Sequence, residues 1–410
     1  MTLARINHIP SERMGLIWIL LNVEDGIVLE YGPAGTTHFS MNFFSKLVPE
    51  LRGRLFTTDM KEKDLVFGDT SQLLRAIKEL DGLYNPKAIF VVNSTISSVI
   101  GTDVDGICSE LQSDVRAKLI PVSSISMSND YTNGVEKAYK ILIDNLVENK
   151  IGISPKTYNI LGASAYDYRV KSDVWEYNSL MSEAFAYKMS SCLALDISCA
   201  TISKIGKAEV NIVCSKEALP IARHLEMLFG TPFVYKVPYG YKGTIEFLET
   251  VSDVIGVKVA ASFKSRLEKK LDKSRMSLMN PFRLTMGRCE PHVYIEGNAD
   301  NVEGLSVFFK SMGFKIAGAR YAYCKKDWTV MEPAEFLEDD SKYVQQITSL
   351  KHCLVLGNKF TKQYCDDSNI KICISNPADD LECIANHLPF IGEKGADYLQ
   401  EYINMYIKSL

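Results

Sequence analysis

The sequence predicts an α/β protein whose strands form parallel sheets, and three observations support this fold class. First, short apolar runs such as Ala88 to Val92 suit strands that are buried on both faces of a parallel sheet. Second, these runs alternate with amphipathic segments in the strand–helix–strand order of a right-handed parallel crossover. Third, this order recurs three times along 410 residues, which is more chain than one hydrophobic core usually spans.

We therefore expect three domains, at residues 1–154, 155–256 and 257–410. A linker at 152–155 closes the first domain, and a long helix at 257–276 opens the third. The basic side chains of this helix are interleaved with Glu268 and Asp272, which is typical of a solvated connecting helix.

Composition excludes several classes of function. A net charge of −4 argues against nucleic acid or an anionic membrane as the main partner. No apolar run approaches the ~20 residues that span a bilayer, and residues 1–15 lack the apolar region of a signal peptide. The expected location is therefore cytoplasmic.

The ten cysteines are scattered without a CxxC pair, which favours buried thiols over disulfides or a zinc site.

In the first domain, Ile27 to Leu29 predicts a strand that ends in a tight turn at residues 32–35. The next helix is expected to begin near Thr37 or Ser40, with a hydroxyl group as its cap. The other expected elements are strands at 64–67, 88–92 and 119–122, a helix after the turn at 68–70 and a helix at 133–147.

The second and third domains follow the same plan. Strands are expected at 158–162, 209–214, 232–237, 292–296, 314–319, 353–356 and 370–374, and helices at 173–188, 216–229 and 300–312, after Gly357, and after 389–396. None of the strand–glycine turns completes a dinucleotide or P-loop motif, so the chain is not expected to bind a nucleotide itself.

The polar loop after Ala88 to Val92 is the expected functional site. It contains Asn93, Ser94 and Thr95, and Asp103 follows. Open α/β sheets bind their ligands outside the carboxyl ends of parallel strands. The serine-rich loop at 123–128 follows another strand and is expected to face the same cleft.

Two segments resemble the nitrogenase component 1 family. Ser94-Thr95-x3-Val99-Ile100-Gly101-x-Asp103 is similar to the family's Thr-Cys-x3-Ile-Gly-Asp-Asp segment, and Gly32-Pro33-x-Gly35-Thr36 is similar to its Gly-Pro-x-Gly-Cys turn. Further similarities extend through the second domain and to the segment at 389–396, so the resemblance covers nearly the whole chain.

The resemblance implies that Ser11, Thr36 and Thr95 stand where the family has cluster-ligating cysteines. Iron–sulfur clusters are held by thiolates, and occasionally by imidazole or carboxylate. A neutral hydroxyl does not readily replace a thiolate, so this chain alone is expected to hold no cluster there. His38 is a candidate substitute ligand, although a histidine after a turn more often caps or packs. Asp103 is a further candidate for the cleft or a subunit interface.

The resemblance also implies three Rossmann-like domains with parallel sheets around a central cleft. Members of the family pair with themselves or with an unlike sister subunit, and an ATP-hydrolysing iron protein delivers electrons to the pair. Any [4Fe-4S] cluster at the interface would be held mainly by the sister subunit. The expected function is reduction of a small molecule or metallocofactor other than dinitrogen. The alternative is a non-catalytic scaffold that binds a cofactor or small molecule.

Overall fold

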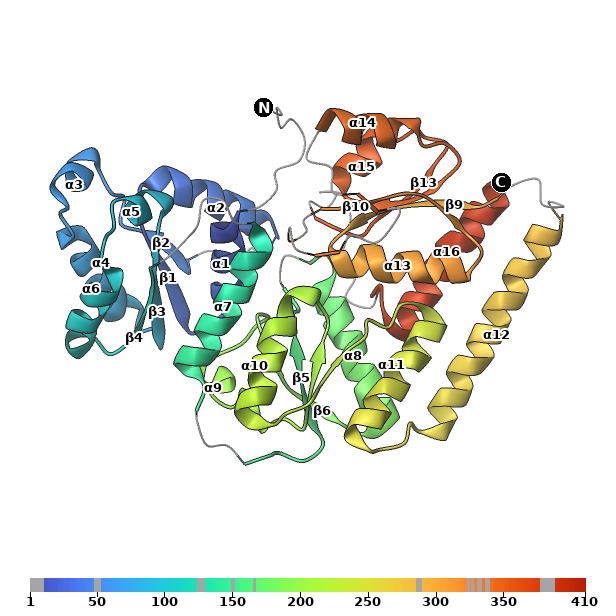
Figure 1. Cartoon of the computed structure of the whole chain (residues 1–410), viewed down its shortest axis with the longest axis horizontal. Helices are drawn as coiled ribbons and strands as arrows, with labels where there is room; N and C mark the ends of the chain where they lie inside the picture. The colour runs from blue at the N-terminus through green and yellow to red at the C-terminus, as the bar shows by residue number, and fades with distance from the viewer. Residues whose placement is uncertain are drawn as a thin grey trace. The chain divides into compact units, whose positions relative to one another are not determined.

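The computed structural model describes residues 11–47, 53–123, 130–148, 152–164, 167–284, 290–322, 325, 328–329, 334–335, 340–376 and 388–410. The chain forms two compact units (Figure 1). The N-terminal unit comprises Pro10–Ile153 and Ser191–Lys207, and the C-terminal unit comprises Ser154–Ser190 and Ala208–Leu410. The domain boundaries at residues 154 and 256 stay predictions.

The N-terminal unit is built on a parallel sheet with strand order β2-β1-β3-β4. Its strands are β1 (Gly26–Tyr31), β2 (Leu55–Thr57), β3 (Ala88–Asn93) and β4 (Lys118–Val122). Every residue of β1 and of β3 is buried, as the continuous apolar run at 88–92 predicts for central strands. In register, Val28 of β1 lies opposite Leu55 and Phe90.

The helices of this unit are α1 (Glu12–Leu20), α2 (Ala34–Leu47), α3 (Glu62–Phe67), α4 (Ser71–Tyr84), α5 (Thr95–Val99), α6 (Val104–Leu111), α7 (Tyr131–Leu146) and α9 (Cys199–Ile202). On α4, the buried side chains of Leu73, Ile77 and Leu80 lie on one helical face, as the sequence predicts.

Two local predictions are wrong. Residues 64–67 form part of helix α3 rather than a strand, because the Asp64 carboxylate accepts a 2.9 Å hydrogen bond from the backbone N–H of Lys61 and caps the helix start. Helix α2 begins at Ala34 rather than at Thr37 or Ser40. The Thr37 hydroxyl does not cap it, because this hydroxyl donates to Glu30 at 2.5 Å instead.

Helices α1 and α7 cross at close range. A Cβ atom on Gly15 would lie 2.2 Å from the Tyr131 carbonyl oxygen, and one on Gly134 would lie 1.8 Å from the Glu12 carbonyl oxygen. The rings of Trp18 and Tyr131 meet edge to face beside the crossing, with centroids 5.7 Å apart. Two glycines are therefore required for the helices to approach so closely.

Gly134→Ala is accordingly expected to lower the free energy of unfolding of the N-terminal unit by about 1–3 kcal/mol, because the added methyl group must push the two helix backbones apart. Native-state hydrogen exchange of the α1 and α7 amides measures this loss. The matched control is Gly82→Ala on α4, where a Cβ atom meets nothing within 4 Å. The control is expected to raise stability by about 0.4–1 kcal/mol. Equal effects at both sites would contradict the close crossing.

The C-terminal unit contains two sheets. The middle sheet has the order β6-β5-β7-β8, and the C-terminal sheet has the order β11-β10-β9-β12-β13. The strands are β5 (Thr157–Leu161), β6 (Lys188–Cys192), β7 (Val210–Val213), β8 (Phe233–Tyr235), β9 (His292–Gly297), β10 (Lys315–Tyr321), β11 (Ala334–Glu335), β12 (Leu354–Gly357) and β13 (Ile370–Cys373). With the N-terminal sheet they confirm the predicted α/β fold with three parallel sheets.

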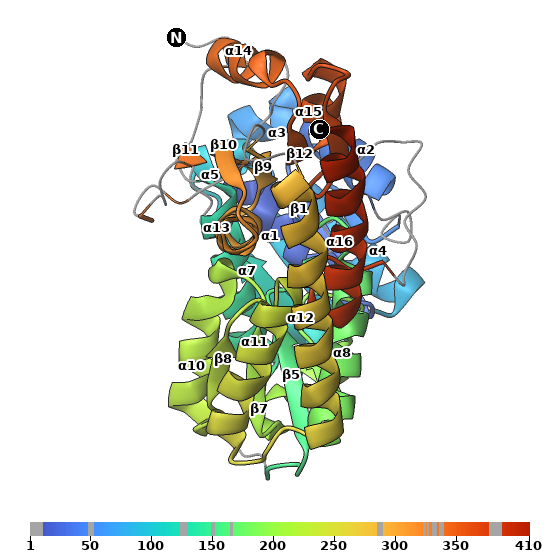
Figure 2. The same cartoon turned by 90° about the vertical axis from the view of Figure 1, so that its right-hand side faces the viewer.

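The helices of the C-terminal unit are α8 (Val170–Phe185), α10 (Leu219–Phe229), α11 (Gly240–Ile255), α12 (Ala261–Leu284), α13 (Ala299–Ser311), α14 (Asp340–Ser349), α15 (Lys359–Tyr364) and α16 (Gly392–Ser409). Figure 2 shows α12 running beside α11 and α16. Arg266 of α12 pairs with Glu393 at 2.7 Å, and Lys270 pairs with Asp397 at 2.7 Å. Some basic side chains of α12 thus form ion pairs with α16 inside the unit.

Within the described residues, no helix combines the length and the apolar character needed to cross a bilayer.

Candidate functional site

The structure brings Thr36 and Thr95 to the same edge of the N-terminal sheet. Thr36 lies in the first turn of α2, just after β1, and Thr95 begins α5, just after β3. The turns that carry them touch, since a Cβ atom on Gly32 would lie 2.4 Å from the Ser94 Cβ atom. Ser11 is the N-cap of α1, whose start lies beside α2. Thr36 and Thr95 therefore lie at the carboxyl ends of β1 and β3, and Ser11 lies at the start of the helix whose Arg13 contacts α2.

Two of these hydroxyl groups are engaged with nearby backbone. The Thr36 hydroxyl donates to the Pro33 carbonyl oxygen at 3.0 Å, and the Ser11 hydroxyl accepts from the Met14 N–H at 3.4 Å. These are ordinary turn and cap interactions.

In the part of the chain that is described, no group of three or more His, Cys, Asp or Glu side chains is placed to hold a metal ion. The residues at these positions do not fit an iron–sulfur cluster, because thiolates are its usual ligands.

A buried ion pair lies behind the hydroxyl positions. Glu30, at the end of β1, is 0% exposed, and Arg13 of α1 donates to both of its carboxylate oxygens. Thr37 donates to the same carboxylate at 2.5 Å, and Arg13 also donates to the Ser40 hydroxyl at 2.9 Å. Such a bidentate pair satisfies both charges internally. The negative charge of Glu30 inside this edge of the sheet is therefore neutralised by Arg13.

His38 and Asp103 lie on the surface of the N-terminal unit. His38 is exposed on α2. The Asp103 carboxylate is the N-cap of α6 and accepts from the Gly106 N–H at 2.9 Å. Asp103 thus has a structural function as a cap. Ligation by His38 and an interface position for Asp103 stay predictions.

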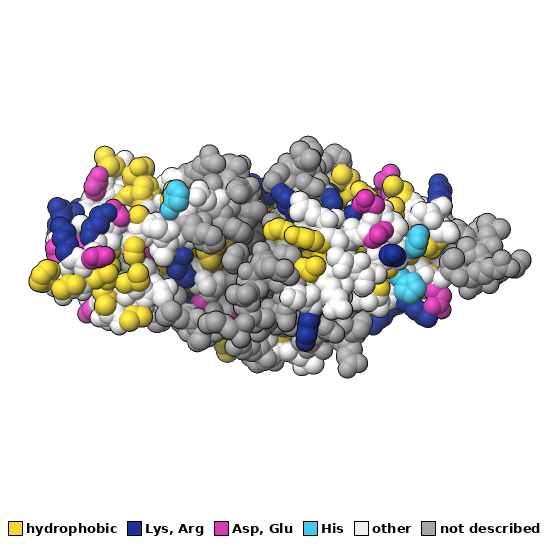
Figure 3. Space-filling model, turned by 90° about the horizontal axis from the view of Figure 1, so that it is seen from above, with side chains coloured by type: hydrophobic (Ala, Val, Ile, Leu, Met, Phe, Trp, Pro, Cys, Tyr) yellow, Lys and Arg dark blue, Asp and Glu magenta, His cyan; other side chains and the backbone are white. Residues whose placement is uncertain are grey.

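Exposed apolar side chains lie on α5, which Thr95 begins, and on neighbouring α3. Val99 and Ile100, directly after Thr95, are 74% and 46% exposed, and Phe67 at the end of α3 is 82% exposed. Tyr31 connects the two segments, because its hydroxyl donates to the Asp69 carbonyl oxygen at 3.3 Å and its own carbonyl oxygen accepts from Ser97 at 2.8 Å. We call Val66, Phe67, Ile96, Val99 and Ile100 the apolar edge surface. Figure 3 shows many apolar side chains at this end of the N-terminal unit.

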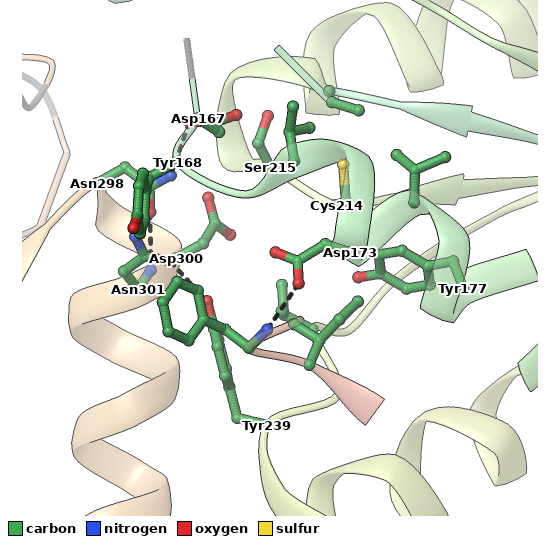
Figure 4. Close-up of a pocket in the computed structure, with 17 residues that line it drawn as sticks. Asp167, Tyr168, Asp173, Tyr177, Cys214, Ser215, Tyr239, Asn298, Asp300 and Asn301 are labelled. Carbon is green, nitrogen blue, oxygen red and sulfur yellow. Dashed lines mark hydrogen bonds between the residues drawn. The ribbon is translucent and has the colours of Figure 1, made fainter. Parts of the chain in front are cut away.

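A second candidate site is a buried pocket of about 50 Å³ in the C-terminal unit. It lies where strands of the middle and C-terminal sheets end (Figure 4). Its walls include Ala163 after β5, Ser215 after β7, Tyr239 after β8 and Asn298 after β9. The carboxyl ends of parallel strands are where α/β proteins bind ligands. We call this cavity the inter-sheet pocket.

Three aspartates line the inter-sheet pocket, and each is held by hydrogen bonds. Asp173 accepts from the Phe390 N–H at 2.8 Å, and Asp167 accepts from the Asn298 side chain at 3.3 Å. Asp300 accepts from the Tyr235 hydroxyl at 2.7 Å and from the Lys216 N–H at 3.0 Å. Loops from both sheets therefore fix the positions of these carboxylates.

Burial makes these carboxyl groups weak acids. Desolvation raises the pKa of Asp167 and that of Asp173 to about 7, and it raises the pKa of Asp300 to about 6. The pKa of neighbouring Glu217 rises to about 8 for the same reason, with a further contribution from the charge of Asp300. Carboxyl groups shifted this far hold protons close to neutral pH and are typical of functional sites.

Tyr177 places a buried hydroxyl group at the wall of the pocket. Its side chain is 2% exposed, and within the described structure its hydroxyl has no hydrogen-bond partner. Asp173 and Tyr177 are four residues apart on α8, so they lie on one helical face. Figure 4 shows the Tyr177 hydroxyl and the Asp173 carboxylate pointing into the same space. A buried hydroxyl without a partner is costly, so a bound ligand would gain from pairing with it.

A larger groove of about 340 Å³ adjoins the inter-sheet pocket. The two share Val237, Tyr239 and Asp300 as lining residues. Helices α11 and α13 form the sides of the groove, and Lys236 pairs with Glu246 at 2.7 Å along it. The groove is thus a route by which a small molecule could approach the pocket.

The sequence predictions identified the three hydroxyl positions but missed the inter-sheet pocket. Its residues come from segments separated by up to 229 positions, from Gly162 to Ile391. One signal was available, because polar residues that line the pocket follow two of the expected strands within two residues, at Ser215 and Asn298. The serine-rich loop at 123–128, which was also expected to face a cleft, lies outside the described residues except for Ser123.

Comparison with known proteins identifies the family. The family model "Nitrogenase component 1 type Oxidoreductase" matches residues 11–407. Because this match spans almost the whole chain, the protein belongs to the nitrogenase component 1 type oxidoreductase family, as the sequence motifs indicate.

Curated relatives include proteins of cofactor assembly and of nitrogenase itself. The chain is 30% identical over 274 residues to the nitrogenase iron-molybdenum cofactor biosynthesis protein NifE of Clostridium pasteurianum, covering 63% of this chain and 58% of that protein. It is 25% identical over 325 residues to the nitrogenase molybdenum-iron protein alpha chain of Methanosarcina barkeri, covering 74% and 58%. The matches thus span little more than half the length of these relatives.

Solved structures of a nitrogenase share the fold. The chain superposes on nitrogenase Cp1 at pH 6.5 with a TM-score of 0.78 and 19% identity, covering 100% of this chain and 94% of that chain. On nitrogenase Cp1 at pH 5 the TM-score is 0.69 with 15% identity, covering 100% and 90%. At these identities the similarity establishes the fold alone.

Proposed function

We propose that the chain is a subunit of a nitrogenase-like two-component reductase that acts on a small molecule or metallocofactor other than dinitrogen. An ATP-hydrolysing iron protein supplies the electrons, and a sister subunit, like or unlike, supplies most ligands of any [4Fe-4S] cluster. Family membership over residues 11–407, combined with hydroxyl groups at all three cysteine positions, carries the proposal. The family has the reductase architecture, and the substitutions require the thiolates to come from another chain.

The apolar edge surface supports the presence of a sister subunit. Apolar side chains as exposed as Phe67 and Val99 are unusual when they gather on one edge of a monomeric protein, and such patches mark protein–protein interfaces. This surface adjoins Thr36 and Thr95, so a partner seated on it would reach the positions where ligands are missing.

The inter-sheet pocket supports a catalytic contribution from this chain. A reduction that adds hydrogen consumes protons as well as electrons. Asp167 and Asp173, whose pKa values burial raises to about 7, hold protons near neutral pH and are positioned as general acids toward a molecule in the pocket. In this proposal the chain binds the substrate, excludes water and supplies protons.

Iron counting after anaerobic purification tests the division of ligands between subunits. The chain alone is expected to carry only background iron, and the chain co-purified with its sister subunit is expected to carry iron at cluster stoichiometry. Cluster-level iron on the isolated wild-type chain would contradict the proposal.

A cysteine variant tests whether the three positions converge. After reconstitution with ferrous iron and sulfide, Ser11→Cys/Thr36→Cys/Thr95→Cys is expected to gain iron and the visible absorption of thiolate-bound clusters. The control places three cysteines at exposed hydroxyl positions on three different helices, as Ser109→Cys/Thr250→Cys/Thr348→Cys. If the folded triple variant takes up no more iron than the control, the positions do not form a common site.

A non-catalytic scaffold that holds a cofactor or small molecule is the second candidate. The observation that favours it is that curated relatives such as NifE of Clostridium pasteurianum are named as cofactor biosynthesis proteins. The iron count separates the two, because a scaffold predicts no iron on the chain alone and none on the pair.

A further inference from the structure

We propose that the inter-sheet pocket binds a small organic cation, of the class of the methylated ammonium ions, between its carboxylates and its aromatic rings. This inference names a substrate class for the pocket and rests on the proposed function only in treating the pocket as the place where a small molecule is bound.

The first argument is the sign of charge on the lining residues. Asp167, Asp173 and Asp300 all line the pocket, and the residues described around it include no lysine, arginine or histidine. When these groups are ionised, an anion would be repelled from this cavity, whereas a cation would meet several carboxylates at short range in a medium of low dielectric constant.

The nearest basic side chains are engaged elsewhere. The Arg169 guanidinium lies over the rings of Phe390 and Tyr398, with centroids 5.1 Å and 5.0 Å away, and donates to the Leu388 carbonyl oxygen at 3.0 Å. The Lys216 ammonium pairs with Glu303 at 2.9 Å. Neither side chain lines the pocket, although the charge of Arg169 acts on Asp173 and that of Lys216 acts on Asp300.

The second argument is the aromatic content of the walls. Tyr168, Tyr177, Tyr239 and Phe390 all line the cavity. The Arg169 guanidinium lies over the rings of Tyr168 and Phe390, so Tyr177 and Tyr239 are the rings left for a ligand. Aromatic faces attract cations through their quadrupoles, and cages of such rings recognise methylated ammonium groups in particular. Carboxylates combined with aromatic rings favour an organic cation over a strongly hydrated metal ion. In agreement with this, the described residues include no cluster of three ligands suited to a metal.

The third argument is the unpaired hydroxyl of Tyr177. This side chain is 2% exposed and its oxygen has no partner within the described structure, yet it points into the cavity (Figure 4). The oxygen can accept a hydrogen bond from an ammonium N–H. A ligand that reaches Tyr177 and Asp173 together would satisfy both groups from one helical face.

The size of the cavity limits the ligand. A volume of about 50 Å³ leaves room for roughly three or four water-sized groups. Methylammonium to trimethylammonium covers this range. Larger amines are expected to require the adjoining groove.

Titration of the isolated, iron-free chain with methylammonium, dimethylammonium and trimethylammonium chlorides tests the inference by calorimetry at pH 8. Potassium chloride and sodium acetate at equal ionic strength are the controls. Saturable binding of at least one methylated ammonium ion, with none for either control salt, is expected. No saturable binding, or equal heats with the control salts, would overturn the inference.

Two variants localise the binding. Tyr177→Phe removes only the hydroxyl and is expected to weaken binding about tenfold, and Asp173→Asn is expected to weaken it at least tenfold. The matched control is Tyr158→Phe, in which the lost hydroxyl donates to Asn178 at 3.1 Å and lies outside the pocket. Unchanged affinity in Tyr177→Phe and Asp173→Asn would overturn the site. If Asp173→Asn does not fold, the comparison of Tyr177→Phe with Tyr158→Phe decides alone.

Binding should also weaken as the pH falls from 8 to 6, because protonation removes the negative charge that attracts the cation. The groups that titrate or carry charge around the pocket are Asp167, Arg169, Asp173, Tyr177, Cys214, Lys216, Glu217, Tyr235, Tyr239, Asp300 and Glu303. Affinity that is constant over this range would contradict the carboxylates as the binding groups. These measurements need neither electrons nor a partner, so their failure is distinguishable from failure of the reductase proposal.

Discussion

Arg13→Met is expected to lower the free energy of unfolding of the N-terminal unit by about 3–5 kcal/mol. The substitution leaves the Glu30 carboxylate, which is 0% exposed, without its bidentate partner. Thr37 still donates to Glu30 at 2.5 Å, but a hydroxyl group does not neutralise the charge. Hydrogen exchange of the β1 and β3 amides measures the loss, since these buried strands report the stability of the unit.

The double variant Arg13→Met/Glu30→Leu separates the cost of an orphaned charge from the value of the pair. Replacing both partners of a buried ion pair by apolar residues is often close to neutral, so the double variant is expected to recover most of the stability lost in Arg13→Met. Lys78→Met, which breaks an exposed pair with Asp114 at 2.7 Å, is the matched control and is expected to change little. A loss in Arg13→Met no larger than in Lys78→Met would contradict the buried pair.

The free energy of unfolding of the C-terminal unit is expected to fall as the pH rises from about 5 to about 8. Burial raises the pKa of Asp167 and that of Asp173 to about 7, far above the value near 4 of an unfolded aspartate. Between these values the folded state binds more protons than the unfolded state, so raising the pH favours unfolding. Each such carboxyl group contributes up to about 1.4 kcal/mol per pH unit. Urea unfolding at several pH values measures the slope.

Asp173→Asn tests the origin of this slope. The neutral amide imitates the protonated carboxyl group, so the slope between pH 5 and 7 should decrease by up to about 1.4 kcal/mol per pH unit. The control is Asp81→Asn in the N-terminal unit. Burial alone would raise the pKa of Asp81, but hydrogen bonds from the Ala117 and Arg116 backbone outweigh it and lower the pKa. The stability that Asp81 contributes is lost only when the pH falls through that lowered pKa. The control should therefore leave the dependence of stability on pH above pH 5 unchanged. A rise in stability with pH would contradict the buried acids.

Local patterns in the sequence predicted most of the elements correctly. The apolar run at 88–92 became β3 within one residue, and the helical face of Leu73, Ile77 and Leu80 became the buried side of α4. These features depend on which faces of a short segment are apolar, and that information is local. One error arose because a side chain from the preceding strand intervened, at Thr37, whose hydroxyl is taken by Glu30 rather than by the start of α2. The other, at residues 64–67, arose from a local cap, because the Asp64 carboxylate accepts from the Lys61 N–H.

For the candidate sites, too, local motifs predicted some features and gave no indication of others. The motifs around Gly32 and Ser94 were enough to predict Thr36 and Thr95 as substituted ligand positions, because that prediction needs only residue types at a fixed spacing. No spacing indicated that Glu30 pairs with Arg13, or that Glu296 meets Arg320 at 2.6 Å and the Tyr343 hydroxyl at 2.9 Å. These contacts join strand ends to side chains elsewhere in the chain.

The sequence by itself therefore determined the fold class, the family resemblance and the absence of thiolates at three positions. Only the tertiary structure decided that Asp167, Asp173 and Asp300 share one cavity with an unpaired Tyr177 hydroxyl. The physical reason is that apolar periodicity is a property of neighbouring residues and can be read from a short segment. The burial that raises a pKa or leaves a hydroxyl group unpaired depends on segments that only folding brings together.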